Sequence, residues 1–515
     1  MTETTKEPKF TSSLKWQSIN VTVQVVLQLG FIAALARLIS PNDFGVMAIA
    51  LVVVGFIEIF AQVGIGPALI QNSKVTDNHR QTAFIISLLL GIIFFAGTYL
   101  AAPLLSGFYE EPKLTNVLRC IALSFIISGA SIVPRSMLIK EMRFKSLFAC
   151  SAIAMVLGNV VIGLGLAYYG FGIWAYVFAL LCQNTILGIC YWTAFPGPIG
   201  IKIDDDALFE MVGYGGRSTI FNMINYAAGK ADTLIVAKFS TDWKLIGFYD
   251  RSSYLMGLPV TVLGKLGDSV LFSGMSMIQA ELERLRNTVL KASHILSTLV
   301  IPLTALLYLR AENFTLLLLG EDYIDAVPIV KILFLCVALR SFIKIGDASI
   351  RATDSLTAGS LIKLGFLITI ILGVCLAMKS NPAELSGFIN AAKSVVIATA
   401  LQAIAIAIWF RRGLQVNAQK LAQSILPGIV LCVPVVFANY VLNLKVFDGL
   451  FVWSSSLVSE LNQTIIIGLH ILLASIASII IVLIKPDVLD GGFPETRRSI
   501  VSKFPNSNLS KRLSR

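Results

Sequence analysis

Charged residues are what this sequence has least of. Only 14% of its 515 residues are charged and 56% are hydrophobic, which gives a mean hydropathy of +0.80, whereas a soluble domain carries about 25% charged residues. The stretch 146–201 contains no Asp, Glu, Lys or Arg. Because one membrane helix needs about 20 apolar residues, this stretch predicts two helices joined by a glycine-containing hairpin at 168–172. The composition excludes an ordinary soluble protein and predicts an all-α, polytopic membrane protein.

Cysteine and histidine are also scarce. The seven cysteines lie in apolar segments without a CxxC pair, and His79, His294 and His470 are scattered along the chain. Buried single cysteines behave as small hydrophobic residues, so we expect no disulfide, no metal site and no cofactor. The N-terminal region lacks the short apolar stretch and small-residue cleavage site of a signal peptide, and we therefore expect the first span to be retained.

Apolar segments between clusters of charge predict fourteen membrane spans. These run near 15–38, 44–70, 82–105, 117–135, 146–168, 171–194, 209–237, 245–273, 292–309, 327–350, 358–378, 386–410, 422–443 and 464–484. In alternate loops, 24 Lys and Arg fall on the side of the two termini and 7 on the other side. Basic loops remain in the cytoplasm, so both termini are predicted to be cytoplasmic. The net charge of +11 is then a signal of topology, and nucleic-acid binding is not expected.

The segment 277–291 alternates apolar and charged residues at helical spacing. This pattern predicts an amphipathic helix on the cytoplasmic surface, which could act as a substrate gate or as a plain connector.

A weak internal repeat divides the chain. Ala36-Arg37 and Gly45 recur as Ala237-Lys238 and Gly247, at an offset of 201 to 202 that covers six predicted spans. An even number of spans gives two halves of parallel orientation, a plan that transporters use with the binding site between the halves. The predicted organisation is a cytoplasmic tail 1–14, a first lobe 15–200, a second lobe 201–412, two further spans in 413–485, and a basic cytoplasmic tail 486–515.

Ionisable groups at bilayer depth are costly and usually functional. Nine of the ten Lys and Arg within or at the edges of spans are in the second half. In span ten, Arg340, Lys344, Asp347 and Arg351 share one helix face. A cationic cavity suits a pyrophosphate, because arginine offers a planar fork and lysine a mobile charge. The candidate substrate-binding residues are Arg217, Arg251, Lys265, Arg340 and Lys344.

Structural explanations of these charges stay open. Lys265 with Asp268, and Lys344 with Asp347, could form pairs at i, i+3 spacing. Three other lysines could extend to the membrane interface: they are Lys331, Lys363 and Lys393.

Neutral polar residues form stripes on the same predicted spans, and we expect them to line a hydrated cavity. They are Gln17, Asn20, Gln24 and Gln28 in span one, with Asn222 and Asn225 in span seven. The candidates for coupling to H⁺ or Na⁺ are the intramembrane acids Glu58, Asp232, Asp250, Asp268 and Asp347. Structural polar contacts are the alternative for these acids.

Several sequence blocks resemble a known family. The chain contains LARLISPNDFGVMA at 35–48, GFIEIFAQVGIGPALIQ at 55–71, ADTLIVAKF at 231–239 and LGEDYIDAVPI at 319–329. In this order they resemble the oligosaccharide flippases, the Wzx-like polysaccharide transporters, and in particular the branch with the colanic acid exporter. The resemblance covers roughly residues 15–410.

This resemblance implies the fold of the multidrug/oligosaccharidyl-lipid/polysaccharide superfamily, with two six-helix lobes and two extra C-terminal helices. It implies a flippase of the bacterial inner membrane that moves undecaprenyl-pyrophosphate-linked oligosaccharide by alternating access, for surface polysaccharide or lipopolysaccharide biosynthesis. Membrane lipids, a polysaccharide polymerase and the chain-length machinery are the implied partners. Asp232 matches an acid that some relatives use near a Na⁺ site, although span eleven has no acidic partner here.

Two other functions stay open at this point. A drug/cation antiporter of the same superfamily would favour an acidic or aromatic pocket. A membrane-embedded polysaccharide polymerase or ligase would need catalytic groups in a large outward loop, and the loop 444–463 has only three charges. We therefore expect a transporter and no enzymatic activity.

Overall fold

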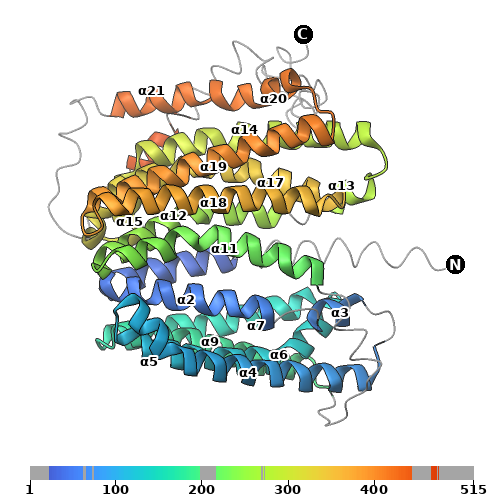
Figure 1. The fold of residues 1–515 in the computed structure, drawn as a ribbon, viewed down its shortest axis with the longest axis vertical. Helices are drawn as coiled ribbons and strands as arrows, with labels where there is room; N and C mark the ends of the chain where they lie inside the picture. Colours follow the sequence, from blue (N-terminus) through green and yellow to red (C-terminus); the bar gives the residue numbers. More distant parts are fainter. Residues whose placement is uncertain are drawn as a thin grey trace. The chain divides into compact units, whose positions relative to one another are not determined.

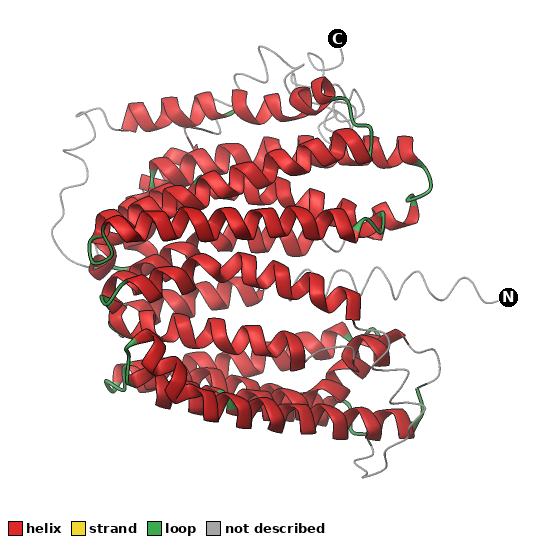
Figure 2. Ribbon diagram, in the orientation of Figure 1, coloured by secondary structure: helices red, strands yellow, loops and turns green. Residues whose placement is uncertain are grey.

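The computed structural model describes residues 23–61, 65–71, 75–197, 216–267, 271, 273–442, 466–472 and 474. Within these ranges the regular structure is helical and contains no strand, as Figure 2 shows. The predicted all-α class is confirmed. Gln17, Asn20 and Asp268 lie outside the described residues.

The chain divides into two compact units, Met1–Arg251 with Val374–Phe388, and Ser252–Gly373 with Ile389–Arg515. The first unit contains a helix Val23–Ala36 and further elements whose ribbon runs from blue to green in Figure 1. They are α2 (Pro41–Ala61), α3 (Ile65–Gln71), α4 (Asp77–Tyr109), α5 (Lys113–Ile121), α6 (Leu123–Lys140), α7 (Phe144–Met155), η1 (Val156–Leu164), α8 (Gly165–Tyr168), α9 (Ile173–Ala194) and α11 (Gly216–Phe239).

Helix α12 (Trp243–Gly267) begins in the first unit and ends in the second. The second unit then contains α13 (Ser273–Met277), α14 (Leu282–Leu309), α15 (Ala311–Leu319), η3 (Glu321–Ala326), α16 (Val327–Phe334), α17 (Cys336–Ala352), α20 (Ala418–Val430) and α21 (Cys432–Leu442). The helices α18 (Leu356–Ser380) and α19 (Leu385–Gly413) have residues in both units.

Nine helices of the described residues are long and apolar enough to cross a membrane, or ten if η3–α16 and α17 form one bent span. The described helices also expose large apolar side chains, such as Leu100 at 74% and Leu104 at 77%. Exposed apolar surface of this extent belongs against lipid rather than water. The chain is a multi-pass membrane protein, and the number fourteen stays a prediction.

The hairpin predicted at 168–172 is confirmed. Helix α8 ends at Tyr168 and α9 begins at Ile173. Between them Gly170 and Gly172 have φ angles of 81° and 54°, a region in which glycine meets no Cβ penalty. Tyr168 and Tyr169 are exposed at the tip, where aromatic rings suit the headgroup level.

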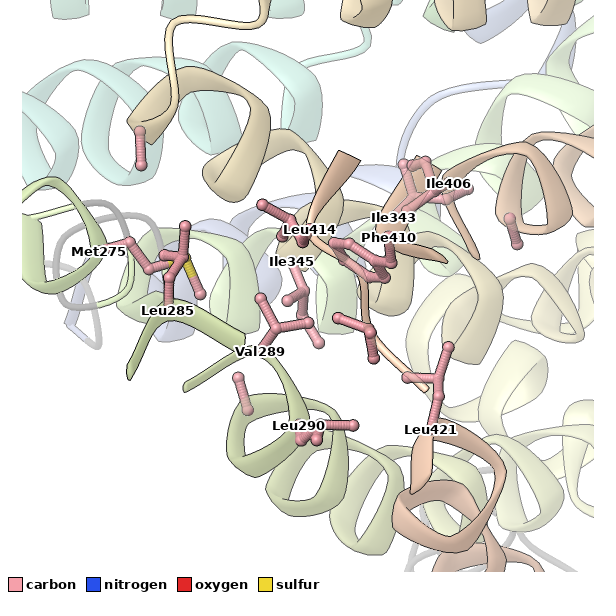
Figure 3. Packing of buried hydrophobic residues seen from close by; sticks show 14 residues of the cluster. Met275, Leu285, Val289, Leu290, Ile343, Ile345, Ile406, Phe410, Leu414 and Leu421 are labelled. Carbon is pink, nitrogen blue, oxygen red and sulfur yellow. The ribbon is translucent and has the colours of Figure 1, made fainter. Parts of the chain in front are cut away.

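The segment 277–291 is not a separate surface helix. After a turn at 278–280, helix α14 begins at Leu282 and continues without a break to Leu309. Leu285 and Val289 belong, with Phe410, to a buried core of the second unit that Figure 3 shows. Side chains of α13, α14, α17, α19 and α20 contribute to this core. The expectation of a separate helix was wrong because no helix-breaking residue separates the amphipathic turns from the apolar span.

Two glycines of the internal repeat meet at the crossing of α2 and α12. A Cβ on Gly45 would collide with the carbonyl oxygen of Trp243, and a Cβ on Gly247 would collide with that of Pro41. Trp243 precedes Gly247 by four residues, and Pro41 precedes Gly45 by four residues. The same contact therefore occurs in both directions between the two helices. These equivalent positions let the two helix backbones touch, which a side chain on either glycine would prevent.

Candidate functional site

A polar cavity lies inside the first unit, with a volume of about 370 Å³. Its walls come from the helix Val23–Ala36 and from α2, α4, α6, α7 and α9. Its neutral polar lining consists of Gln24, Ser87, Ser128, Ser131, Ser151 and Asn184. Polar groups around a cavity of this size suit a small hydrophilic ligand rather than lipid.

The same cavity contains one acid and one base, Glu58 of α2 and Arg135 of α6. The span predicted from the sequence ended at 135, and Arg135 was not among the candidate site residues. Helix α6 instead continues to Lys140, so Arg135 lies within the helix and is exposed to the cavity. The apolar residues that follow it, Met137 to Ile139, were the signal that the helix continues.

Close packing of α4, α6 and α9 fixes one wall of this cavity. The Ser87 hydroxyl donates a hydrogen bond to the carbonyl of Gly129 at 2.9 Å, and a Cβ on Gly129 would collide with the carbonyl of Ser87. From α9, the indole Nε1 of Trp192 donates to the carbonyl of Ala130 at 2.9 Å. These contacts hold the polar wall in place before any ligand binds.

The structure brings together only some of the predicted polar residues. Gln24 and Glu58 line the same cavity, whereas Gln28 and Asn225 are exposed elsewhere on their helices. Arg217 and Asn222 belong to α11, and Lys265 belongs to α12, but their side chains lie outside the described part of the structure.

Arg251 and Asp250 form a buried ion pair on α12. The Nε and Nη2 atoms of Arg251 donate to one carboxylate oxygen of Asp250, with a distance of 2.9 Å for Nε. The guanidinium carbon also lies 4.5 Å from the ring centroid of Phe44. Arg251 is 3% exposed, so its guanidinium is buried against Asp250 and Phe44 within the first unit.

Asp232 is a buried carboxylate with a tyrosine partner. The hydroxyl of Tyr249 on α12 donates to Oδ2 of Asp232 on α11 at 3.0 Å, and Asp232 is 4% exposed. No ion pair of the described residues involves Asp232. Burying a carboxylate is costly unless it is paired or hydrogen-bonded, and the Tyr249 hydroxyl supplies one such hydrogen bond.

The charged residues predicted to share one face of α17 have different surroundings in the structure. Asp347 pairs with Lys363 of α18 at 2.9 Å, and both side chains are buried. Lys363 therefore does not extend to an interface, and Asp347 is not paired with Lys344. Arg340 and Lys344 are half-buried. The aliphatic part of the Lys344 side chain lies beside Gly264 of α12: its Cε atom is 3.6 Å from the position that a Cβ on Gly264 would take.

These features define a multi-pass helical membrane protein with charged side chains buried among its helices. The fold is similar to the solved structure of the lipid II flippase MurJ in an inward closed conformation, with a TM-score of 0.70 and 13% identity over 90% of this chain and 98% of that chain.

The sequence comparisons supply the family. The chain belongs to the polysaccharide biosynthesis protein family, whose model matches residues 34–328. It is 22% identical to the teichuronic acid biosynthesis protein TuaB of Bacillus subtilis (strain 168) over 64% of this chain and 68% of that protein. It is also 22% identical to the lipopolysaccharide biosynthesis protein WzxC of Escherichia coli (strain K12), over 65% of this chain and 68% of that protein. The family predicted from the sequence blocks is confirmed.

Proposed function

We propose that this protein is a flippase that moves undecaprenyl-pyrophosphate-linked oligosaccharide units across the bacterial inner membrane for surface polysaccharide biosynthesis. The observation that carries the proposal is a polar cavity with an acid and a base inside membrane-length helices, in a chain of the polysaccharide biosynthesis family. Polar groups at bilayer depth are maintained where a hydrophilic cargo must pass.

The substrate has two parts that need different surroundings. Its pyrophosphate and sugars need hydrogen-bond donors and cations, and its polyprenyl chain can stay in the lipid. Half-buried Arg340 and Lys344 are suited to the pyrophosphate, because guanidinium and ammonium groups form charge-assisted hydrogen bonds with its oxygens. Transport by alternating access breaks no covalent bond, so the protein acts as a transporter and not as an enzyme.

The cellular setting follows from the same proposal. Both termini face the cytoplasm, where the excess of basic loops is expected to remain. The cargo is assembled on the cytoplasmic leaflet and used on the opposite one, where a polysaccharide polymerase and chain-length machinery receive it.

Replacing Arg340 or Lys344 with alanine should slow transfer of a lipid-pyrophosphate-linked oligosaccharide in proteoliposomes by about tenfold or more, since a charge-assisted hydrogen bond contributes about 1.5–3 kcal/mol. The matched control is Lys379→Ala, an exposed lysine in the last turn of α18, which should transfer at the wild-type rate. Wild-type rates in both α17 variants would remove this helix from the substrate path.

We further propose that Asp232 couples transport to an ion gradient. Asp250 and Asp347 each have a cation in contact, whereas Asp232 has the Tyr249 hydroxyl. A carboxylate whose partner is a neutral hydroxyl keeps lone pairs that can bind a coupling ion.

The Asp232→Asn variant should lose the acceleration that a proton or Na⁺ gradient gives, while transfer toward equilibrium without a gradient continues. The assay compares transfer rates in proteoliposomes with and without each gradient. Tyr249→Phe is the companion variant, since it removes the hydroxyl but keeps the carboxylate, and should retain part of the acceleration. Full acceleration in Asp232→Asn would exclude this residue as the coupling group.

A further inference from the structure

The first-unit cavity has properties that the pyrophosphate of the proposed substrate does not require. Its volume of about 370 Å³ lies near the lower end of the roughly 300–1,000 Å³ typical of small-molecule sites. One or two sugar rings have this size. A polyprenyl chain would need a longer and apolar groove.

The polar groups of the cavity match the hydroxyl pattern of a sugar. A carboxylate has two oxygens that accept hydrogen bonds, and a guanidinium offers a fork of donors. Glu58 and Arg135 bring both kinds of group to one cavity. The hydroxyls of Ser128 and Ser151, with the amide of Asn184, can each donate and accept. The Ser131 hydroxyl donates to the Ile127 carbonyl at 2.7 Å and can accept from a ligand.

The apolar part of the lining suits the carbon-bound hydrogens of a sugar ring. Phe125, Ile132, Leu187 and Tyr191 contribute to the cavity wall. Small-molecule sites combine such apolar surfaces with a few placed polar groups that fix orientation.

The charge balance argues against a site for the pyrophosphate itself. A pyrophosphate in this cavity would meet the carboxylate of Glu58 as well as the guanidinium of Arg135, and repulsion between like charges would offset the attraction. An uncharged polyol meets no such conflict, because it donates to the acid and accepts from the base.

We propose that the first-unit cavity is a saccharide-binding subsite for one or two sugar residues, with Glu58 accepting from sugar hydroxyls and Arg135 donating to them. This inference rests on the proposed function, since the sugar is part of the lipid-linked cargo. It assigns recognition of the sugar to α2 and α6 in the first unit.

The test measures binding of three lipids to the full-length protein in detergent by native mass spectrometry. The lipids are undecaprenyl diphosphate and the same lipid with one glucose or one galactose on its diphosphate. We expect at least one of the sugar-bearing lipids to bind about tenfold more tightly than the bare lipid. Glu58→Gln and Arg135→Gln should each reduce this preference to about one, with little change in binding of the bare lipid.

The matched control is Arg143→Gln, an exposed arginine just before α7 that lies 4.0 Å from Glu141. It should keep the preference for the sugar-bearing lipid. Equal binding of all three lipids to the wild-type protein would overturn the subsite and leave the flippase proposal intact, whereas no binding of any lipid would count against both. A loss of bare-lipid binding in Arg135→Gln would instead make the cavity a phosphate site and overturn the assignment to sugar.

Discussion

Replacing Lys363 with methionine should destabilise the protein by about 3–5 kcal/mol, the usual cost of removing one partner from a buried ion pair. The ammonium of Lys363 lies 2.9 Å from the Asp347 carboxylate, and these side chains are only 7% and 13% exposed. Without the lysine, the carboxylate would stay charged in a buried position or would have to bind a proton. Thermal unfolding of the purified variant in detergent measures the loss.

The double variant Asp347→Asn with Lys363→Met distinguishes the ion pair from simple packing. Because both charges are then absent, most of the lost stability should return, as buried pairs replaced by neutral groups are often tolerated. A surface pair provides the reference, since Arg284 and Glu281 are 2.9 Å apart but 68% and 53% exposed. Arg284→Gln should cost less than about 1 kcal/mol. A double variant as unstable as Lys363→Met would contradict the pairing.

Adding a single methyl group at Gly45 or Gly247 should also strongly disturb the protein. Each Cβ would collide with a backbone carbonyl of the opposite helix, and a backbone atom cannot rotate away as the end of a side chain can. Overpacking of a core costs about 1–3 kcal/mol or more, which exceeds the roughly 1 kcal/mol that alanine gains over glycine in a helix. The net result should be a lower unfolding temperature and a lower yield of folded protein in the membrane.

Gly257 is the control within the same helix, because a Cβ at that position meets no heavy atom within 4 Å. Gly257→Ala should leave stability unchanged or slightly raised. Combining Gly45→Ala with Gly247→Ala should cost less than the sum of the single variants, since one separation of α2 from α12 relieves both collisions. Full additivity would show that the two glycines act independently.

The sequence predicted features that depend on local pattern. The absence of charge over 146–201 and the glycines of the hairpin defined two helices whose ends the structure reproduces within a few residues. The repeat located Gly45 and Gly247 as equivalent positions. It did not show that they touch, because a contact between helices depends on packing that no single segment encodes.

The partners of the charged residues also depend on packing between helices, which the pattern of one segment does not show. Asp347 and Lys363 are 16 residues apart, and their pairing requires α17 and α18 to lie side by side, so helical spacing alone directed Asp347 to the wrong lysine. Arg135 was missed because the predicted span ended at 135, five residues before the end of helix α6. Residue type and periodicity identified Glu58 and Gln24, while the cavity that joins them depends on tertiary structure.

The central claim is that the protein moves a lipid-linked oligosaccharide between leaflets. The most direct measurement reconstitutes the wild-type protein in liposomes with undecaprenyl-pyrophosphate-linked oligosaccharide confined to the inner leaflet, and then follows labelling of the sugar by an added enzyme that cannot enter. Labelling that rises with time, only with folded protein, and faster under a proton or Na⁺ gradient is the predicted result. Labelling no faster than in protein-free liposomes, under either gradient and for several oligosaccharides, would contradict the account.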